Sequence, residues 1–332
     1  MKNLLLILLL LLTGEISAQQ TATIVVKTTP DNEIAYWPTG KDHLFFITLG
    51  TKAQADPQGQ FVHEFSVSRP TTIHVWAKGN NSFTLYLTPG SKDTIAVAKD
   101  TINFSGTNRV YNRCLKAVDD YQQYSDNLIY MQPHELEGVT SLEQYHQLAD
   151  ARMKQALDSV NASGLDKEFL AEQRAHIDYT HRSIFLHVAM YLVKNENFTE
   201  NWRKELAEII NQPVDSDYLR SYRGIGLFIN DLIGAQFIKL ENGKPEEIKD
   251  YCSFRFDRYR KFFKGDNLQY AQALLIYEDE FQTRNTPSIP QLYERYKAEF
   301  PNSPFLSVLE PGVNKNLRFQ NSRIDDKDYH IL

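Results

Sequence analysis

The chain has 332 residues, of which 42% are hydrophobic and 23% charged, and its formal net charge is −6. This length allows one large domain or two ordinary ones, and the composition is that of a globular protein. The acidic balance makes nucleic acid and anionic membrane surfaces poor partners, so we expect the protein to bind neither.

Residues 1–18 have the pattern of a secretory leader. Lys2 supplies a positive start, residues 4–12 form an unbroken apolar run, and a short polar stretch ends in Ala18. As a helix this run is about 14 Å long, too short for a hydrocarbon core of about 30 Å. We therefore expect cleavage after Ala18, export to the periplasm or cell envelope, and no membrane span.

Residues 19–106 predict an antiparallel β-sandwich domain, because short apolar runs alternate with turn residues. In one run, Phe83, Leu85 and Leu87 alternate with more polar residues, the period of a half-buried strand. We expect strands over residues 21–28, 43–49, 59–65, 72–77, 82–87 and 94–98.

Residues 107–312 have the apolar period of helices and predict a helical domain of roughly eight helices. The clearest helix is expected over residues 166–194, and capping boxes at Ser141 and Ser288 begin two others. No fixed repeat is present, so a regular solenoid is not supported. The expected fold class is α+β, with the sandwich followed by an irregular all-helical domain.

Residues 313–332 are interpreted as a C-terminal tail or as the start of a further domain. Leu317 and Phe319 indicate a short strand there. A polar stretch then leads to the terminal pair Ile331-Leu332.

The two cysteines, Cys114 and Cys252, each lie on the apolar side of a predicted helix. Such positions suit buried thiols that pack as small hydrophobic residues. A structural disulfide between them is the alternative, because an exported chain meets an oxidising compartment. Neither cysteine belongs to a C-x-x-C motif, so we assign no catalytic role to either.

Three histidines share the clearest predicted helix, but their spacing does not suit a metal ion. His176 and His181 are about 140° apart around the helix axis, and His187 lies about three turns, or roughly 16 Å, from His176. A metal-binding pair on a helix needs a spacing of three or four residues. We interpret all three as surface or hydrogen-bonded core histidines.

The segment Arg255–Lys264 interleaves basic and aromatic residues. In an acidic, exported protein we interpret it as an amphipathic helix with Phe256, Tyr259 and Phe263 facing inward. A contact with an anion or a glycan is the alternative.

Other chemical motifs are absent from the sequence. It contains no G-x-S-x-G, H-E-x-x-H, P-loop or calcium-loop motif. The pairs Asp119-Asp120 and Glu246-Glu247 are interpreted as solvated helix surface, and the many tyrosines as packing residues rather than sugar platforms. We predict no catalytic, cofactor-binding or metal-binding residue, and whether the protein is an enzyme stays open.

An ordered succession of short motifs runs through residues 20–320. Its members, in chain order, are Gly59-Gln-Phe61, Leu85-Tyr-Leu-Thr-Pro-Gly90, Phe104-Ser-Gly106-Thr-Asn108, Asn112 and Leu115, and finally Tyr293 with Phe300-Pro301-Asn-Ser303. This succession resembles the N-terminal region of exported thioredoxin-like thiol:disulfide oxidoreductases of Bacteroidetes-type bacteria.

The resemblance implies a β-sandwich and a helical region in front of a thioredoxin domain, with that domain and client proteins as partners. Ser91 departs from the aspartate usual after Pro-Gly, and Asp93 lies two residues on. The family's catalytic W-C-x-x-C matches nothing in this sequence, so no redox residue is carried over.

The resemblance therefore implies a non-catalytic accessory or binding region of a cell-envelope oxidoreductase, a region without the thioredoxin domain. A free-standing exported protein that binds a glycan or a peptide is the alternative. The sequence predicts no oligomeric state.

Overall fold

The computed structural model describes residues 20–39, 44, 50–79, 81–98, 101–130, 142–192 and 200–322. The expected leader, the expected strand at 43–49 apart from Leu44, and the capping residue Ser141 lie outside these residues.

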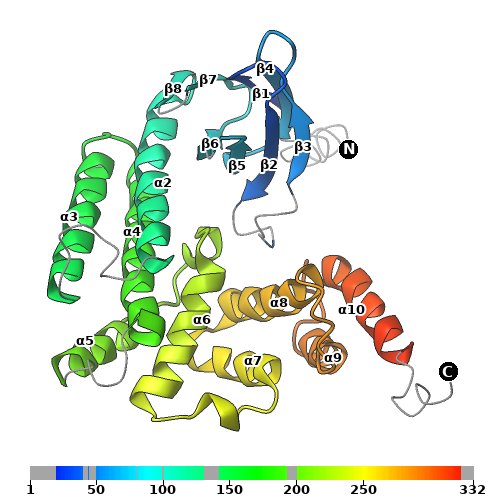
Figure 1. Ribbon diagram of the computed structural model, residues 1–332. Helices are drawn as coiled ribbons and strands as arrows, with labels where there is room; N and C mark the ends of the chain where they lie inside the picture. The colour runs from blue at the N-terminus through cyan, green and yellow to red at the C-terminus, as the bar shows by residue number, and fades with distance from the viewer. Residues whose placement is uncertain are drawn as a thin grey trace, which may run out of the picture. The chain divides into compact units, whose positions relative to one another are not determined.

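The chain forms two compact units, shown in Figure 1. The first unit is Met1–Pro38 with Leu49–Asp119, and the second is Thr39–Thr48 with Asp120–Leu332. Strands come first and helices follow, which confirms the predicted α+β class.

The first unit contains two four-stranded sheets among its described residues, with strand orders β4-β1-β7-β8 and β3-β2-β5-β6. β1 pairs with β4 in antiparallel and with β7 in parallel, so the sandwich is mainly but not wholly antiparallel. The strands are β1 (Gln20–Lys27), β2 (Glu33–Thr39), β3 (Thr51–Gln54), β4 (Gln60–Val67), β5 (Thr71–Ala77), β6 (Asn81–Leu87), β7 (Lys92–Ala98) and β8 (Thr101–Gly106).

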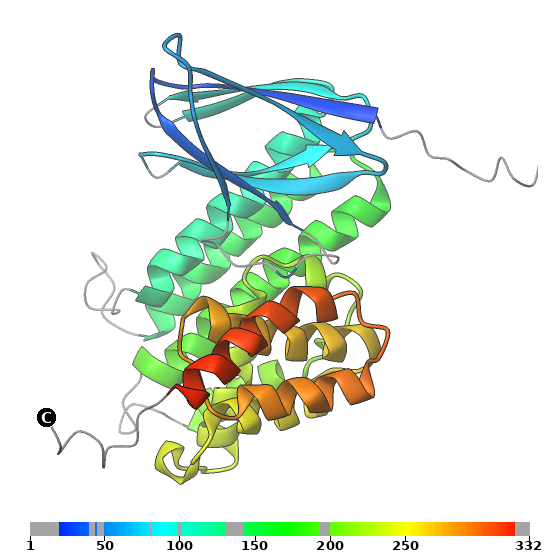
Figure 2. The same cartoon turned by 90° about the vertical axis from the view of Figure 1, so that its right-hand side faces the viewer.

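The two sheets enclose one apolar core, and they lie face to face in Figure 2. Ile24 of β1 and Ile95 of β7 meet side chains from the other sheet there. The predicted alternation along β6 is confirmed, because Phe83, Leu85 and Leu87 are fully buried. Burying one such side chain contributes roughly 1.5–3 kcal/mol, so this face fixes the register of β6.

Side chains of helix α2 (Arg109–Tyr130) close the outer edge of β6. The Thr84 N–H donates to Asp119 Oδ2 at 2.5 Å, and the Tyr86 N–H donates to Asn112 Oδ1 at 2.7 Å. An edge strand turns every second N–H away from its partner strand. These two acceptors satisfy N–H groups that the sheet leaves unpaired.

The interpretation of Asp119 as solvated helix surface is therefore wrong, because its side chain is buried against β6. Its Oδ1 also accepts a hydrogen bond from Thr84 Oγ1 at 3.0 Å. Glu246 and Glu247 are exposed, as expected.

The helical part has nine α-helices among the described residues. After α2 come α3 (Leu142–Asn161), α4 (Lys167–His187), α5 (Glu200–Asn211), α6 (Ile225–Ala235), α7 (Tyr251–Phe262), α8 (Gly265–Phe281), α9 (Ile289–Glu299) and α10 (Leu306–Asn321). Shorter turns are the π-helices η2 (Val188–Leu192) and η5 (Gln236–Leu240) and the 3₁₀ helices η4 (Leu219–Ser221) and η6 (Pro245–Glu247).

The long helix expected over residues 166–194 is confirmed. Asp166 caps the start of α4 by accepting from the Phe169 N–H at 2.9 Å, and η2 extends the helix to Leu192. The helix expected after Ser288 also forms, beginning at Ile289, but the Ser288 side chain makes no capping hydrogen bond.

The strand expected at Leu317 and Phe319 is wrong, because both residues belong to α10. Pro311 lies inside this helix. α10 nevertheless continues past the proline, because it buries Leu309 and Val313 against the second unit's core. It packs beside α8 and α9, as Figure 2 shows.

We expect Gly106→Ala to lower the free energy of unfolding by at least about 2 kcal/mol. Gly106 has a φ of +110°, and a Cβ there would lie 2.2 Å from the carbonyl oxygen of Lys92. Urea unfolding followed by circular dichroism measures the loss. Gly226→Ala is the control, because a Cβ at Gly226 in α6 meets nothing within 4 Å. A Gly106→Ala protein as stable as Gly226→Ala would contradict the account.

Candidate ligand-binding site

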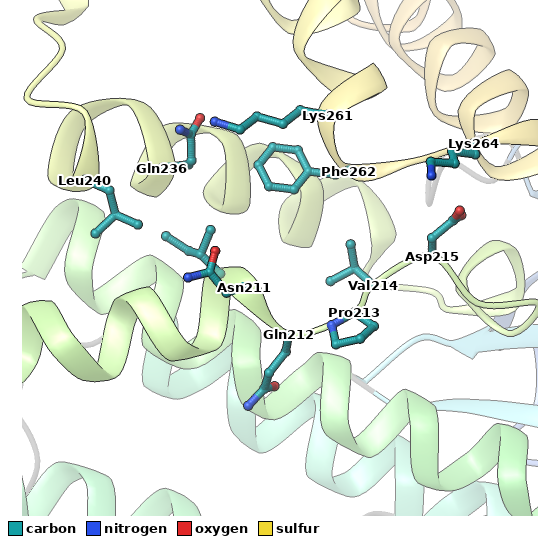
Figure 3. A pocket seen from close by; sticks show the side chains of 11 residues that line it. Asn211, Gln212, Pro213, Val214, Asp215, Gln236, Leu240, Lys261, Phe262 and Lys264 are labelled. Atoms are coloured by element: carbon teal, nitrogen blue, oxygen red, sulfur yellow. The ribbon is translucent and has the colours of Figure 1, made fainter.

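The second unit contains a pocket of about 440 Å³ (Figure 3). This volume lies within the range of small-molecule sites, roughly 300–1,000 Å³. Three segments line it: residues 210–215 at the end of α5, Gln236 and Leu240 of η5, and Lys261, Phe262 and Lys264 at the end of α7.

Arg182 of α4 holds the first wall of the pocket in place. Its Nη2 donates to the carbonyl oxygens of Ile209 at 2.9 Å and Gln212 at 3.2 Å, and its Nη1 donates to that of Pro213 at 3.1 Å. The last carbonyls of a helix have no partner within the helix. Arg182, which is 3% exposed, satisfies that of Ile209 in α5 and fixes the backbone that follows the helix.

The second wall is a network around Glu241. Gln236 bonds to both Arg258 and Glu241, and Arg258 Nη2 lies 2.5 Å from Glu241 Oε2. Lys261 Nζ donates to Glu241 Oε1 at 2.9 Å. These hydrogen bonds, chiefly the one from Arg258, lower the pKa of Glu241 to about 2. Gln236 belongs to a π-helix, an element frequent at functional sites.

Several polar side chains of the lining have no partner inside the described protein. The side-chain amides of Asn211 and Gln212 make no hydrogen bond, and Lys264 forms no ion pair, among the described residues. Asp215 differs, because its Oδ1 accepts from Asn267 Nδ2 at 2.7 Å.

Phe262 lies at the centre of the lining, with Lys261 on one side and Lys264 on the other (Figure 3). Its side chain is half-buried and packs against the core of the second unit. Pro213 and Leu240 add further apolar surface. An apolar floor with a few polar groups around it can hold a small organic ligand.

The two cysteines are both buried thiols, as the packing interpretation predicts. Cys114 belongs to the first unit and Cys252 to the second, and no disulfide joins them. Burial raises the pKa of the Cys252 thiol, which disfavours the thiolate needed for redox chemistry.

The three histidines of α4 each face a different polar group. Nε2 of His176 lies 3.0 Å from Ser221 Oγ, Nε2 of His181 lies 3.1 Å from Asp150 Oδ1, and Nδ1 of His187 lies 2.9 Å from Asp231 Oδ2. Within the part of the chain that the structure describes, no three His, Cys, Asp or Glu side chains gather as a metal site requires.

The Arg255–Lys264 segment is helical up to Phe262, where α7 ends, and Phe256, Tyr259 and Phe263 are buried as predicted. The sequence did not reveal that Arg255 is buried as well, at 2% exposed. Arg255 donates to Tyr259 Oη at 2.9 Å and pairs with Glu278 at 3.4 Å. The tyrosines expected to pack include Tyr121 and Tyr293, which are also buried.

The motif residues behind the family resemblance have structural roles. Gly59, Gly90 and Gly106 all have positive φ angles, where glycine is favoured. Asp93 accepts from the N–H of Asn108 at 2.7 Å and from its Nδ2 at 2.9 Å, which ties β7 to the start of α2. None of these motif residues lines the pocket.

Sequence reasoning missed most of the pocket, because its lining comes from three separated segments. The one signal was the basic-aromatic segment Arg255–Lys264, which ends in Lys261, Phe262 and Lys264. An anion or glycan contact was its alternative interpretation.

Comparisons with protein-family models, with curated proteins and with solved structures find no match to this chain. No described helix combines the length and apolar character needed to cross a membrane. The functional argument therefore depends on the residues themselves.

We expect the stability of the second unit to depend on the protonation of His146. The ring of His146 packs edge-on against Phe185 and Trp202, and burial lowers its pKa to about 4. Between about pH 6.5 and pH 4, His146 is therefore protonated in the unfolded chain but stays neutral in the folded chain. The free energy of unfolding consequently falls as the pH falls through this range.

His146→Gln removes this proton uptake. The free energy of unfolding of the wild type, minus that of the variant, should fall by about 2 kcal/mol when the pH is lowered from 7.5 to 5. Urea unfolding at both pH values measures this change. The same comparison between pH 7.5 and pH 8.5 is the control, because His146 is neutral there in both the folded and the unfolded chain. A difference unchanged at pH 5 would show that His146 titrates normally in the folded protein.

Proposed function

We propose that this chain is a non-catalytic accessory region of an exported, thioredoxin-like thiol:disulfide oxidoreductase. In this role it positions the thioredoxin domain or binds client proteins. The observation that supports the proposal most is the order of the fold, a β-sandwich followed by helices, which is the order that the sequence resemblance implies.

The environment of the cysteines also supports a non-catalytic role. Disulfide exchange needs a thiolate of low pKa and a second cysteine that resolves the mixed disulfide. Cys114 and Cys252 are 3% and 6% exposed, and they belong to different units. Neither thiol is placed to attack a disulfide in a client protein.

We expect the purified chain, residues 19–332, to reduce insulin with dithiothreitol no faster than dithiothreitol alone, because it lacks an exposed thiolate. Turbidity of the precipitating insulin B chain measures the rate, and a thioredoxin serves as the positive control. Insulin reduction that Cys114→Ser or Cys252→Ser abolishes would contradict the non-catalytic role.

The second candidate function is that of a free-standing exported binding protein for a glycan or a peptide. The pocket between α5, η5 and α7 favours it, because the exposed side chains of Asn211 and Lys264 have no hydrogen-bond or ion-pair partner among the described residues and are available to a ligand. A few polar groups of this kind orient a ligand in a largely apolar pocket.

A binding protein should be stabilised by its ligand. We expect a rise in melting temperature with at least one member of a panel of oligosaccharides and peptides, and the rise should disappear in Phe262→Ala. Differential scanning fluorimetry measures it. A flat response across the panel would count against a free-standing binding protein.

A further inference from the structure

We propose that the pocket of the second unit binds an acidic sugar, a pyranose that carries a carboxylate, as in a uronic-acid oligosaccharide. This inference rests on the second candidate function and gives it a ligand class. It is carried by three features of the lining: the half-buried ring of Phe262, the exposed amide of Asn211, and the ammonium group of Lys264, which has no ion-pair partner among the described residues.

The aromatic face is Phe262, half-buried at the centre of the lining with Pro213 and Leu240 nearby. A pyranose has a face of C–H groups that packs flat on an aromatic ring and removes apolar area from water. The ring is held from behind by the core of the second unit, so it is in place before a ligand arrives.

The amide of Asn211 matches the hydroxyl groups of a sugar. It offers both donors and an acceptor, and a hydroxyl likewise donates and accepts. Asn211 lies across the pocket from Phe262 in Figure 3, so a ring packed on Phe262 would lie beside it.

The charge of the lining favours a carboxylate on the sugar. The lining holds two lysines and one carboxylate, Asp215, so its net charge is positive. Lys261 pairs with Glu241, whereas Lys264 has no ion-pair partner among the described residues. An ammonium group of this kind gains a charge-assisted hydrogen bond from an anionic ligand and nothing comparable from a neutral one.

A peptide fits the lining less well than a sugar. Peptides are commonly bound through main-chain hydrogen bonds to a strand edge or to unpaired backbone groups. The lining consists of helix ends and a loop, and the carbonyls of Ile209, Gln212 and Pro213 already accept from Arg182. Side chains remain as the main polar contacts, which suits a polyol.

Titration calorimetry of the intact chain, residues 19–332, tests the proposal with three probes. They are trigalacturonic acid, the neutral α-1,4-linked galactotriose that lacks its carboxylates, and triglutamate peptide. We expect trigalacturonic acid to bind about fivefold more tightly than galactotriose, the effect of one partly exposed ion pair. Triglutamate should show no binding at millimolar concentration.

Three variants separate the contribution of the lysine charge to binding from that of the aromatic ring. Lys264→Gln should weaken trigalacturonic acid about fivefold and leave galactotriose unchanged. Phe262→Leu should weaken both sugars by about tenfold, because it removes the flat ring but keeps apolar volume. Lys315→Gln, a substitution of an exposed lysine on α10, is the matched control and should change neither. Thermal melting checks that each variant is folded, and Lys264→Gln carries the test if Phe262→Leu is not.

The possible failures are distinguishable. Equal binding of the two sugars, unaffected by Lys264→Gln, would overturn the acidic class and leave a glycan-binding protein. Binding of triglutamate in place of the sugars would overturn the sugar and support a peptide ligand. No binding of any probe would overturn the inference, and the insulin assay would still decide the accessory role independently.

Discussion

The unpaired edge of β6 is the constraint around which the first unit is built. Strands at the edge of a sheet present unsatisfied N–H groups that invite pairing with other chains. Here Asp119 accepts from the Thr84 N–H, and Asn112 accepts from the Tyr86 N–H. These two acceptors stand where a neighbouring strand would otherwise lie. The sheet is closed by side chains, and α2 must start where it does for them to reach β6.

A hydrogen-bonded series of side chains extends this closure. Thr84 Oγ1 donates to Asp119 and lies 3.1 Å from Nδ1 of His74, whose Nε2 lies 2.5 Å from Ser82 Oγ. A serine, a histidine and a carboxylate thus share one hydrogen-bonded series. The imidazole is 3% exposed, however, and both of its nitrogens are occupied. The series therefore ties β5 and β6 to α2.

Local periodicity predicted the order of strands and helices, the buried face of β6 and the burial of both cysteines, because each depends on residues close in sequence. It missed β2, β3 and β8, which are short or lack clear apolar alternation and depend on their sheet partners. It placed Asp119 in solvent, because its partner Thr84 lies 35 residues away in the chain. The pocket was hidden for the same reason: Asn211, Gln236 and Phe262 come together only in the folded second unit.

Native-state hydrogen exchange at the amides of β6 tests the central claim most directly. If side chains of α2 close the edge, the Thr84 and Tyr86 amides exchange as slowly as the inward-facing Phe83 and Leu85 amides. The Tyr86 amide alone should then lose most of its protection in Asn112→Ala. Fast exchange at Thr84 and Tyr86 in the wild type, as at an ordinary open edge, would contradict the account.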